Sequence, residues 1–85
     1  MHTIELYDGP TFSSKRTLVE VLSLPPQGCN LGEMRKRIKI MDAIEAAEGK
    51  VDLEDADYEL LKSAFLSFPF RLAHRDLVEI GKAFD

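Results

Sequence analysis

An amphipathic run over residues 31–48 constrains the fold of this chain more than any other feature. Asn30, directly before it, offers a helix N-cap, and Glu33 three residues later gives the start the character of a capping box. Gly49 follows the run, as is typical just beyond a helix end. The sequence therefore predicts one long helix with a broad apolar stripe at helical spacing. The stripe contains Met34, Ile38, Ile40, Met41, Ile44 and Ala47.

Charged side chains follow an unusual order along this predicted helix. A helix carries partial positive charge at its N-terminus and partial negative charge at its C-terminus, so acidic residues are favoured first and basic residues last. The order here is reversed, at a cost of about 0.3–1 kcal/mol for each exposed charge. The reversal suggests a helix shaped for contact, and a plain solvated face is the alternative. The basic residues are Arg35, Lys36, Arg37 and Lys39, and the acidic residues are Asp42, Glu45 and Glu48.

Two short runs near the N-terminus predict a β-hairpin. Residues 3–7 alternate apolar and polar side chains, which is typical of a half-buried strand, and the Asp8-Gly9-Pro10 turn ends them. Residues 17–24 are rich in Leu and Val, and the short length of this run before Pro25-Pro26 favours a buried strand over a helix. Residues 50–53 are a candidate short third strand.

Two further helices are predicted in the second half of the chain. The first begins near Asp55, where acidic residues suit the helix dipole, and ends before Pro69. The second covers about residues 73–84. The predicted fold class is α+β, with an N-terminal β-hairpin, extended by the candidate third strand, packed on three α-helices. All of residues 1–85 belong to a single small domain.

Composition and charge exclude some function classes. The formal net charge of −4 argues against a general nucleic-acid binder, because neutralisation of phosphates provides most of the affinity in such proteins. A single cysteine, Cys29, cannot form an internal disulfide, which fits a reducing compartment. The sequence has neither the apolar run of about 20 residues that spans a bilayer nor the features of a signal peptide. We therefore expect a cytoplasmic protein without a membrane partner.

The residues that carry most chemistry do not form a catalytic or metal-binding pattern. A calcium loop needs Gly at its sixth position and Glu at its twelfth, but counted from Asp52 these positions hold Asp57 and Ser63. His74 lies two residues before Asp76, yet no serine has the sequence context of a nucleophile. No Gly-rich phosphate loop is present. We expect no enzymatic activity and no cofactor, and we assign no catalytic, cofactor-binding or metal-binding residue.

Several residues are candidates for contact with a partner. Arg35, Lys36 and Lys39 project from the polar side of the first helix and would suit nucleic acid, but the acidic second half of that helix would repel phosphates. Two copies packed antiparallel would instead place each basic half against the acidic half of the other copy, as a two-fold dimer requires. Phe70, directly after Pro69, is a candidate apolar anchor. The predicted partner-binding residues are Arg35, Lys36, Lys39, Asp42, Glu45 and Phe70.

Three stretches of the chain carry a resemblance to a group of known proteins. Residues 28–37, 40–45 and 53–62 read GCNLGEMRKR, IMDAIE and LEDADYELLK. They resemble small uncharacterised proteins encoded by phages and prophages, and the resemblance covers about residues 18–84. It implies a non-enzymatic accessory role in phage assembly or host takeover, in the cytoplasm of the host cell. It defines no functional residue.

The favoured hypothesis is a non-enzymatic protein–protein interaction module that acts as a homodimer. The alternative is a small DNA-binding transcriptional regulator that uses the basic start of the first helix, and it would lose DNA affinity steeply as salt increases. An enzyme is the third interpretation. Clustering of His74 with acidic residues in a deep pocket would favour it.

Overall fold

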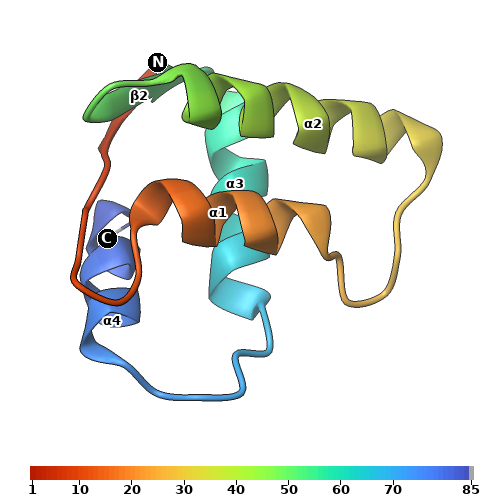
Figure 1. The fold of residues 1–85 in the computed structure, drawn as a ribbon. Helices are drawn as coiled ribbons and strands as arrows, with labels where there is room; N and C mark the ends of the chain where they lie inside the picture. The colour runs from red at the N-terminus through yellow and green to blue at the C-terminus, as the bar shows by residue number, and fades with distance from the viewer. Residues whose placement is uncertain (85) are drawn as a thin grey trace.

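The computed structural model describes residues 1–84 and has, in that part of the chain, two β-strands, four α-helices and one short 3-10 helix. In chain order these are β1 (His2–Glu5), α1 (Ser14–Ser23), α2 (Leu31–Ala46), β2 (Lys50–Leu53), α3 (Asp55–Ser67), α4 (Arg75–Gly81) and the 3-10 helix η1 (Lys82–Phe84). Helices α1 and α2 run antiparallel, α3 crosses behind both, and α4 lies at one end (Figure 1). The predicted α+β class is confirmed.

The two strands form one antiparallel sheet, in which Ile4 is opposite Val51. Ile4, Val51 and Leu53 are buried on one face, because alternate residues of a strand point the same way. The predicted strand over residues 50–53 is confirmed with the same ends, and the one over residues 3–7 is confirmed as β1 with its ends shifted to residues 2 and 5. The candidate third strand is therefore the actual partner of the N-terminal strand.

The predicted strand over residues 17–24 is wrong, because this run belongs to helix α1, and its predicted pairing with residues 3–7 is replaced by the β1–β2 pairing. Helix α1 begins before the run, where the Ser13 side chain accepts a hydrogen bond from the Arg16 amide and caps the helix. With this polar first turn included, the buried side chains fall at helical spacing on one face. They are Ser14, Thr17, Leu18, Val21 and Leu22. Residues 1–84 therefore contain four α-helices rather than the three predicted.

Helix α2 confirms the predicted long helix. Asn30 Oδ1 accepts a hydrogen bond from the Glu33 amide at 2.8 Å, so the predicted N-cap is correct. The Glu33 carboxylate pairs with Arg37 one turn further on, at 3.1 Å, instead of returning to the backbone of Asn30. Gly49 has a φ of 82° and lies in the turn between α2 and β2, where its carbonyl accepts a hydrogen bond from the Leu6 amide. A positive φ of this kind favours glycine.

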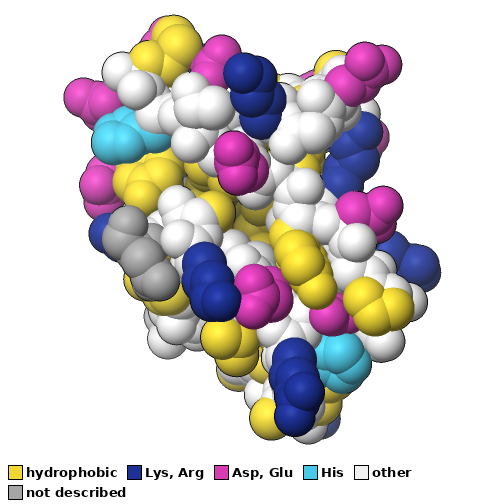
Figure 2. All heavy atoms as spheres, turned by 90° about the vertical axis from the view of Figure 1, so that its left-hand side faces the viewer, with side chains coloured by type: hydrophobic (Ala, Val, Ile, Leu, Met, Phe, Trp, Pro, Cys, Tyr) yellow, Lys and Arg dark blue, Asp and Glu magenta, His cyan; other side chains and the backbone are white. Residues whose placement is uncertain are grey.

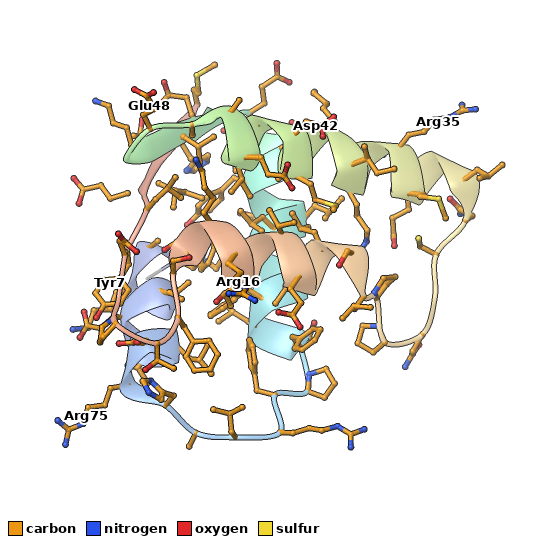
Figure 3. All side chains as sticks on the ribbon, in the orientation of Figure 1. Tyr7, Arg16, Arg35, Asp42, Glu48 and Arg75 are labelled. Carbon is orange, nitrogen blue, oxygen red and sulfur yellow. The ribbon has the colours of Figure 1, made fainter. Side chains whose placement is uncertain are left out.

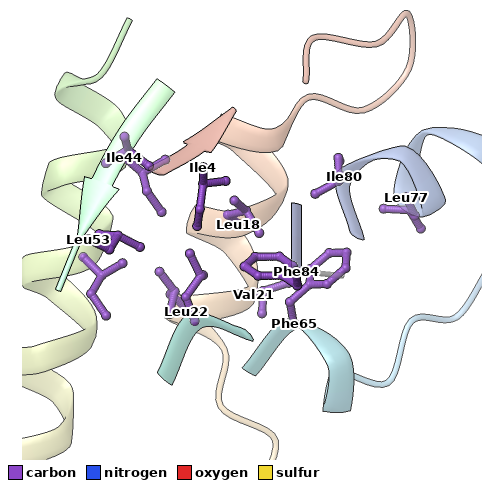
Figure 4. Packing of buried hydrophobic residues seen from close by; sticks show 13 residues of the cluster. Ile4, Leu18, Val21, Leu22, Ile44, Leu53, Phe65, Leu77, Ile80 and Phe84 are labelled. Carbon is purple, nitrogen blue, oxygen red and sulfur yellow. The ribbon is translucent and has the colours of Figure 1, made fainter. Parts of the chain in front are cut away.

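The core is enclosed by the sheet, α1, α2, α3 and the C-terminal helices (Figure 4). Helix α3 ends before Pro69, as predicted, because proline cannot continue a helix. The predicted helix over residues 73–84 is confirmed as α4 followed by η1. The Phe84 ring packs near those of Tyr58 and Phe65, with centroids 6.0 and 5.5 Å away. The buried core side chains are Ile4, Leu18, Val21, Leu22, Ile40, Ile44, Val51, Leu53, Leu61, Phe65, Leu77, Ile80 and Phe84.

Candidate interaction surface

Helix α2 has a second apolar face, which points away from the core. Ile40 and Ile44 pack inward and are 1% and 0% exposed. Leu31, Met34 and Ile38, in contrast, are 67%, 41% and 47% exposed. The two sets lie about 120° apart around the helix, because successive residues are rotated by about 100°. The broad apolar stripe predicted from sequence is therefore divided into a core face and an exposed face.

The exposed face forms a continuous row, called here the α2 stripe. It consists of Leu31, Met34, Ile38 and the half-buried Met41, separated by three, four and three residues. The first half of α2 extends beyond α3 (Figure 1), and the row's three side chains in that half, Leu31, Met34 and Ile38, are exposed. A contiguous exposed apolar surface is more indicative of a contact site than a single exposed apolar residue.

The predicted partner-binding charges on α2 divide into free and committed groups. Lys39 Nζ lies 3.2 Å from Asp57 Oδ2 on α3. Arg37, the remaining basic residue, donates to the carbonyl of Leu22 at 3.0 Å as well as to Glu33. Arg35 projects outward from α2 (Figure 3). The four charges that are exposed and have no hydrogen bond or ion pair to another described residue are Arg35, Lys36, Asp42 and Glu45.

Phe70 lines a hollow and packs against other rings, and does not project alone from the surface. Its half-buried ring lies 5.4 and 4.9 Å from the rings of Phe65 and Phe68, measured between centroids. It lines a hollow of about 390 Å³ between α1 and the α3–α4 connection. Two other lining residues, Leu24 and Leu72, are each 53% exposed. The break at Pro69 indicated this region in the sequence, but no pattern indicated the two exposed leucines.

A buried carboxylate, Asp76, fastens the loop after β1 to the start of α4. It accepts hydrogen bonds from the Tyr7 hydroxyl at 3.1 Å and from the amides of Thr11 and Phe12 at 3.0 Å. The amide of Phe12, and then that of Thr11, lower the pKa of Asp76, because their hydrogen bonds favour the charged form. The hydrogen bond to Asp76 raises the pKa of Tyr7. His74 Nδ1 accepts from the Asp76 amide at 3.0 Å, so both residues of the His-x-Asp pair hold structure together.

The acidic residues near β2 and the start of α3 have separate partners and do not converge on one point. Asp55 lies 3.0 Å from His2 Nε2, and Asp57 is the partner of Lys39. Within residues 1–84 no three His, Cys, Asp or Glu side chains form a group that could hold a metal ion. The face made by β1, the following loop and α4 shows acidic and basic side chains interspersed (Figure 2). That face therefore does not present a charge of one sign to a partner.

Comparison of the chain with protein-family models, with curated proteins and with solved structures finds no match. None of the helices in the described part of the chain is long and apolar enough to cross a membrane. A function for this protein is therefore proposed from its own geometry, and the α2 stripe is the surface on which it rests.

Proposed function

We propose that this protein is a non-enzymatic protein–protein interaction module that acts as a homodimer through the exposed face of α2. The observation that carries the proposal is the α2 stripe, in which three consecutive large apolar side chains are more than 40% exposed: Leu31, Met34 and Ile38. Burial of each such side chain by a partner would contribute about 1.5–3 kcal/mol at most. Burial of this surface against a partner is therefore more favourable in free energy than its exposure to water.

A second copy of the chain is the partner that suits this face. A domain of this size buries only about 60–65% of the surface of its unfolded chain, so added burial at a dimer interface is a substantial supplement to its stability. A two-fold dimer needs a self-complementary surface, and α2 carries both apolar residues and charges of both signs. The spacing of the stripe is also that of helices which pack side by side.

The biological setting rests on the resemblance to small phage- and prophage-encoded proteins. On that basis the homodimer serves as an accessory or assembly protein in the cytoplasm of the host cell. The hollow beside Phe70 is a second surface on which such a module would hold another protein, because its lining is mostly apolar and two lining leucines are exposed.

The second candidate function is a small DNA-binding transcriptional regulator. Arg35 and Lys36 favour it, because both are exposed near the start of a helix. Lys39 and Arg37 favour it less, since both are engaged within the chain. An electrophoretic mobility-shift assay with duplex DNA separates the two functions: a regulator retards DNA at low salt and loses affinity steeply as salt rises, whereas the interaction module leaves DNA unretarded.

Measurement of the mass in solution tests the homodimer. We expect sedimentation equilibrium to give twice the monomer mass, and Ile38→Glu to give the monomer, because the substitution places a charge in the middle of the stripe. Val78→Glu is the matched control, since Val78 is 66% exposed on α4 and lies outside the stripe. Wild-type protein that stays monomeric at high concentration in low salt would contradict the proposal.

A further inference from the structure

The α2 stripe has the spacing of a coiled-coil seam. Leu31, Met34, Ile38 and Met41 alternate steps of three and four residues, and Glu45 takes the next position of the same pattern. Residues at these steps occupy the contact positions when one helix packs along another. The helix that would cover the stripe therefore runs nearly parallel or antiparallel to α2, and does not cross it steeply.

Only one flank of this seam is open to a partner. On one side lie Arg37 and Ile44, which are held against the body of the same chain: Arg37 bonds to the carbonyl of Leu22, and Ile44 is fully buried. On the other side lie Arg35 and Asp42, seven residues apart. Both are exposed, and neither has a hydrogen bond or ion pair to another residue in the part of the chain that the structure describes.

The open flank decides between the two orientations of a second copy. In a parallel pair the open flank of one helix faces the closed flank of the other, which would place Arg35 and Asp42 against side chains already packed on α1 and the core. In an antiparallel pair the two open flanks face each other. Arg35 of each copy then lies beside Asp42 of the other copy, and the two ion pairs form by symmetry.

We propose that two copies pack α2 against α2 antiparallel, in a register with Ile38 opposite Met41 and with Arg35 of each copy paired to Asp42 of the other. This inference rests on the proposed homodimer and specifies its orientation and register. Lys39 takes no part, because it stays with Asp57. The arrangement also places the basic half of each α2 beside the electronegative C-terminal half of the other, which offsets the unfavourable order of charges along the helix.

Charge reversal tests the register. Arg35→Asp and Asp42→Arg should each weaken dimerisation by about tenfold in low salt, because each turns two attractive pairs into two repulsive ones. The double variant should recover the wild-type dissociation constant to within about threefold. Lys36→Asp is the control: it makes the same charge change as Arg35→Asp on the same helix, but it lies on the side of α2 opposite the stripe. It should leave dimerisation nearly unchanged. Sedimentation velocity over a dilution series gives the constants.

The outcomes separate the register from the homodimer. A wild-type monomer would overturn both. A wild-type dimer that is unaffected by the single reversals, or not rescued by the double variant, would overturn the antiparallel register and leave the homodimer standing. Arg35→Asp replaces a good helix former by a poorer one, so a weaker dimer supports the register only where the helix content of the variant is unchanged. Circular dichroism of each variant measures that helix content.

Discussion

At the scale of single residues, the Asp76 side chain makes the hydrogen bonds that join the most distant parts of the described chain. Its carboxylate accepts hydrogen bonds from the hydroxyl of Tyr7 and from two backbone amides of the loop that leads into α1. The loop passes so close that a Cβ on Gly9 would lie 2.7 Å from Asp76 Cγ, which explains a glycine at that position. The charged Asp76 carboxylate therefore stabilises this one conformation of the loop.

Asp76→Asn should lower the melting temperature by several degrees and make the melting temperature less dependent on pH in the acidic range. The pKa of Asp76 is lower in the folded chain than its ordinary value of 3.8, so the stability that the carboxylate contributes is complete above that value and is lost as the pH falls through the folded pKa. In Asp76→Asn the amide oxygen can still accept from the Thr11 and Phe12 amides, but the N–H₂ then faces the Tyr7 hydroxyl, which must turn from donor to acceptor. Melting curves between acidic and neutral pH measure both effects.

Asp8→Asn is the matched control for this prediction, because Asp8 is exposed in the same loop and no side-chain hydrogen bond of Asp8 is present among the described residues. The decrease in melting temperature of Asp8→Asn at acidic pH should follow that of the wild type. If Asp76→Asn and the wild type lost stability in parallel as the pH fell, the carboxylate would not be the group that titrates.

Residue-level prediction from sequence succeeded where the partners are close along the chain. The N-cap at Asn30 was predicted correctly, since its donor is the amide of Glu33, three residues away. The role of Asp76 was not found, because its donors lie 64 to 69 residues earlier. A local pattern carries no information about which loop returns to a given helix.

At the scale of elements, helix α1 shows why a short apolar run is ambiguous. Its Leu and Val residues alone favour a buried strand. The polar residues before them decide otherwise: Ser13 caps the helix, and buried Ser14 accepts a hydrogen bond from the Tyr7 amide at 2.7 Å while donating its own amide to the Tyr7 carbonyl. A strand assignment that begins at residue 17 omits the turn that makes the segment helical.

The N-terminal cap of α2 allows an element-level prediction. Asn30→Ala should lower the free energy of unfolding by about 1 kcal/mol, because the amide of Glu33 loses its acceptor. Asn30→Asp should retain the stability, since aspartate is an equally good cap and suits the dipole. Urea denaturation measures both variants, with Gln27→Ala in the preceding exposed turn as the control. Equal midpoints for Asn30→Ala and Gln27→Ala would show that the cap adds nothing.

The two faces of α2 also mark the limit of prediction for the candidate site. Sequence periodicity identified the apolar residues correctly, but it gave one broad stripe. Only the packing of α1, α3 and the sheet shows that Ile40 and Ile44 are covered while Leu31, Met34 and Ile38 are not. The ion pairs of α2 have the same limit, because the spacing of residues along α2 does not reveal that Lys39 reaches Asp57 on another helix.

At the scale of the whole molecule, stability and assembly are coupled through α2. The same helix contributes Ile40 and Ile44 to the core and the α2 stripe to the proposed interface. A partner that binds only the folded chain stabilises it by mass action, so the stability of a homodimer depends on protein concentration. For a domain of this size the effect is visible, since about 1 kcal/mol shifts the melting temperature by roughly 4–8 °C.

The melting temperature of the wild type should therefore rise as the protein concentration is raised over about a hundredfold range, and the rise should persist in Val78→Glu and vanish in Ile38→Glu. Higher salt should reduce the rise only in part, because it screens the exposed ion pairs but not the apolar contacts. Differential scanning calorimetry at several concentrations makes the measurement. A wild-type melting temperature that does not change with concentration would mean that the folded monomer tolerates the α2 stripe in water, and the exposed leucines beside the Phe70 hollow would then be the surface to test next.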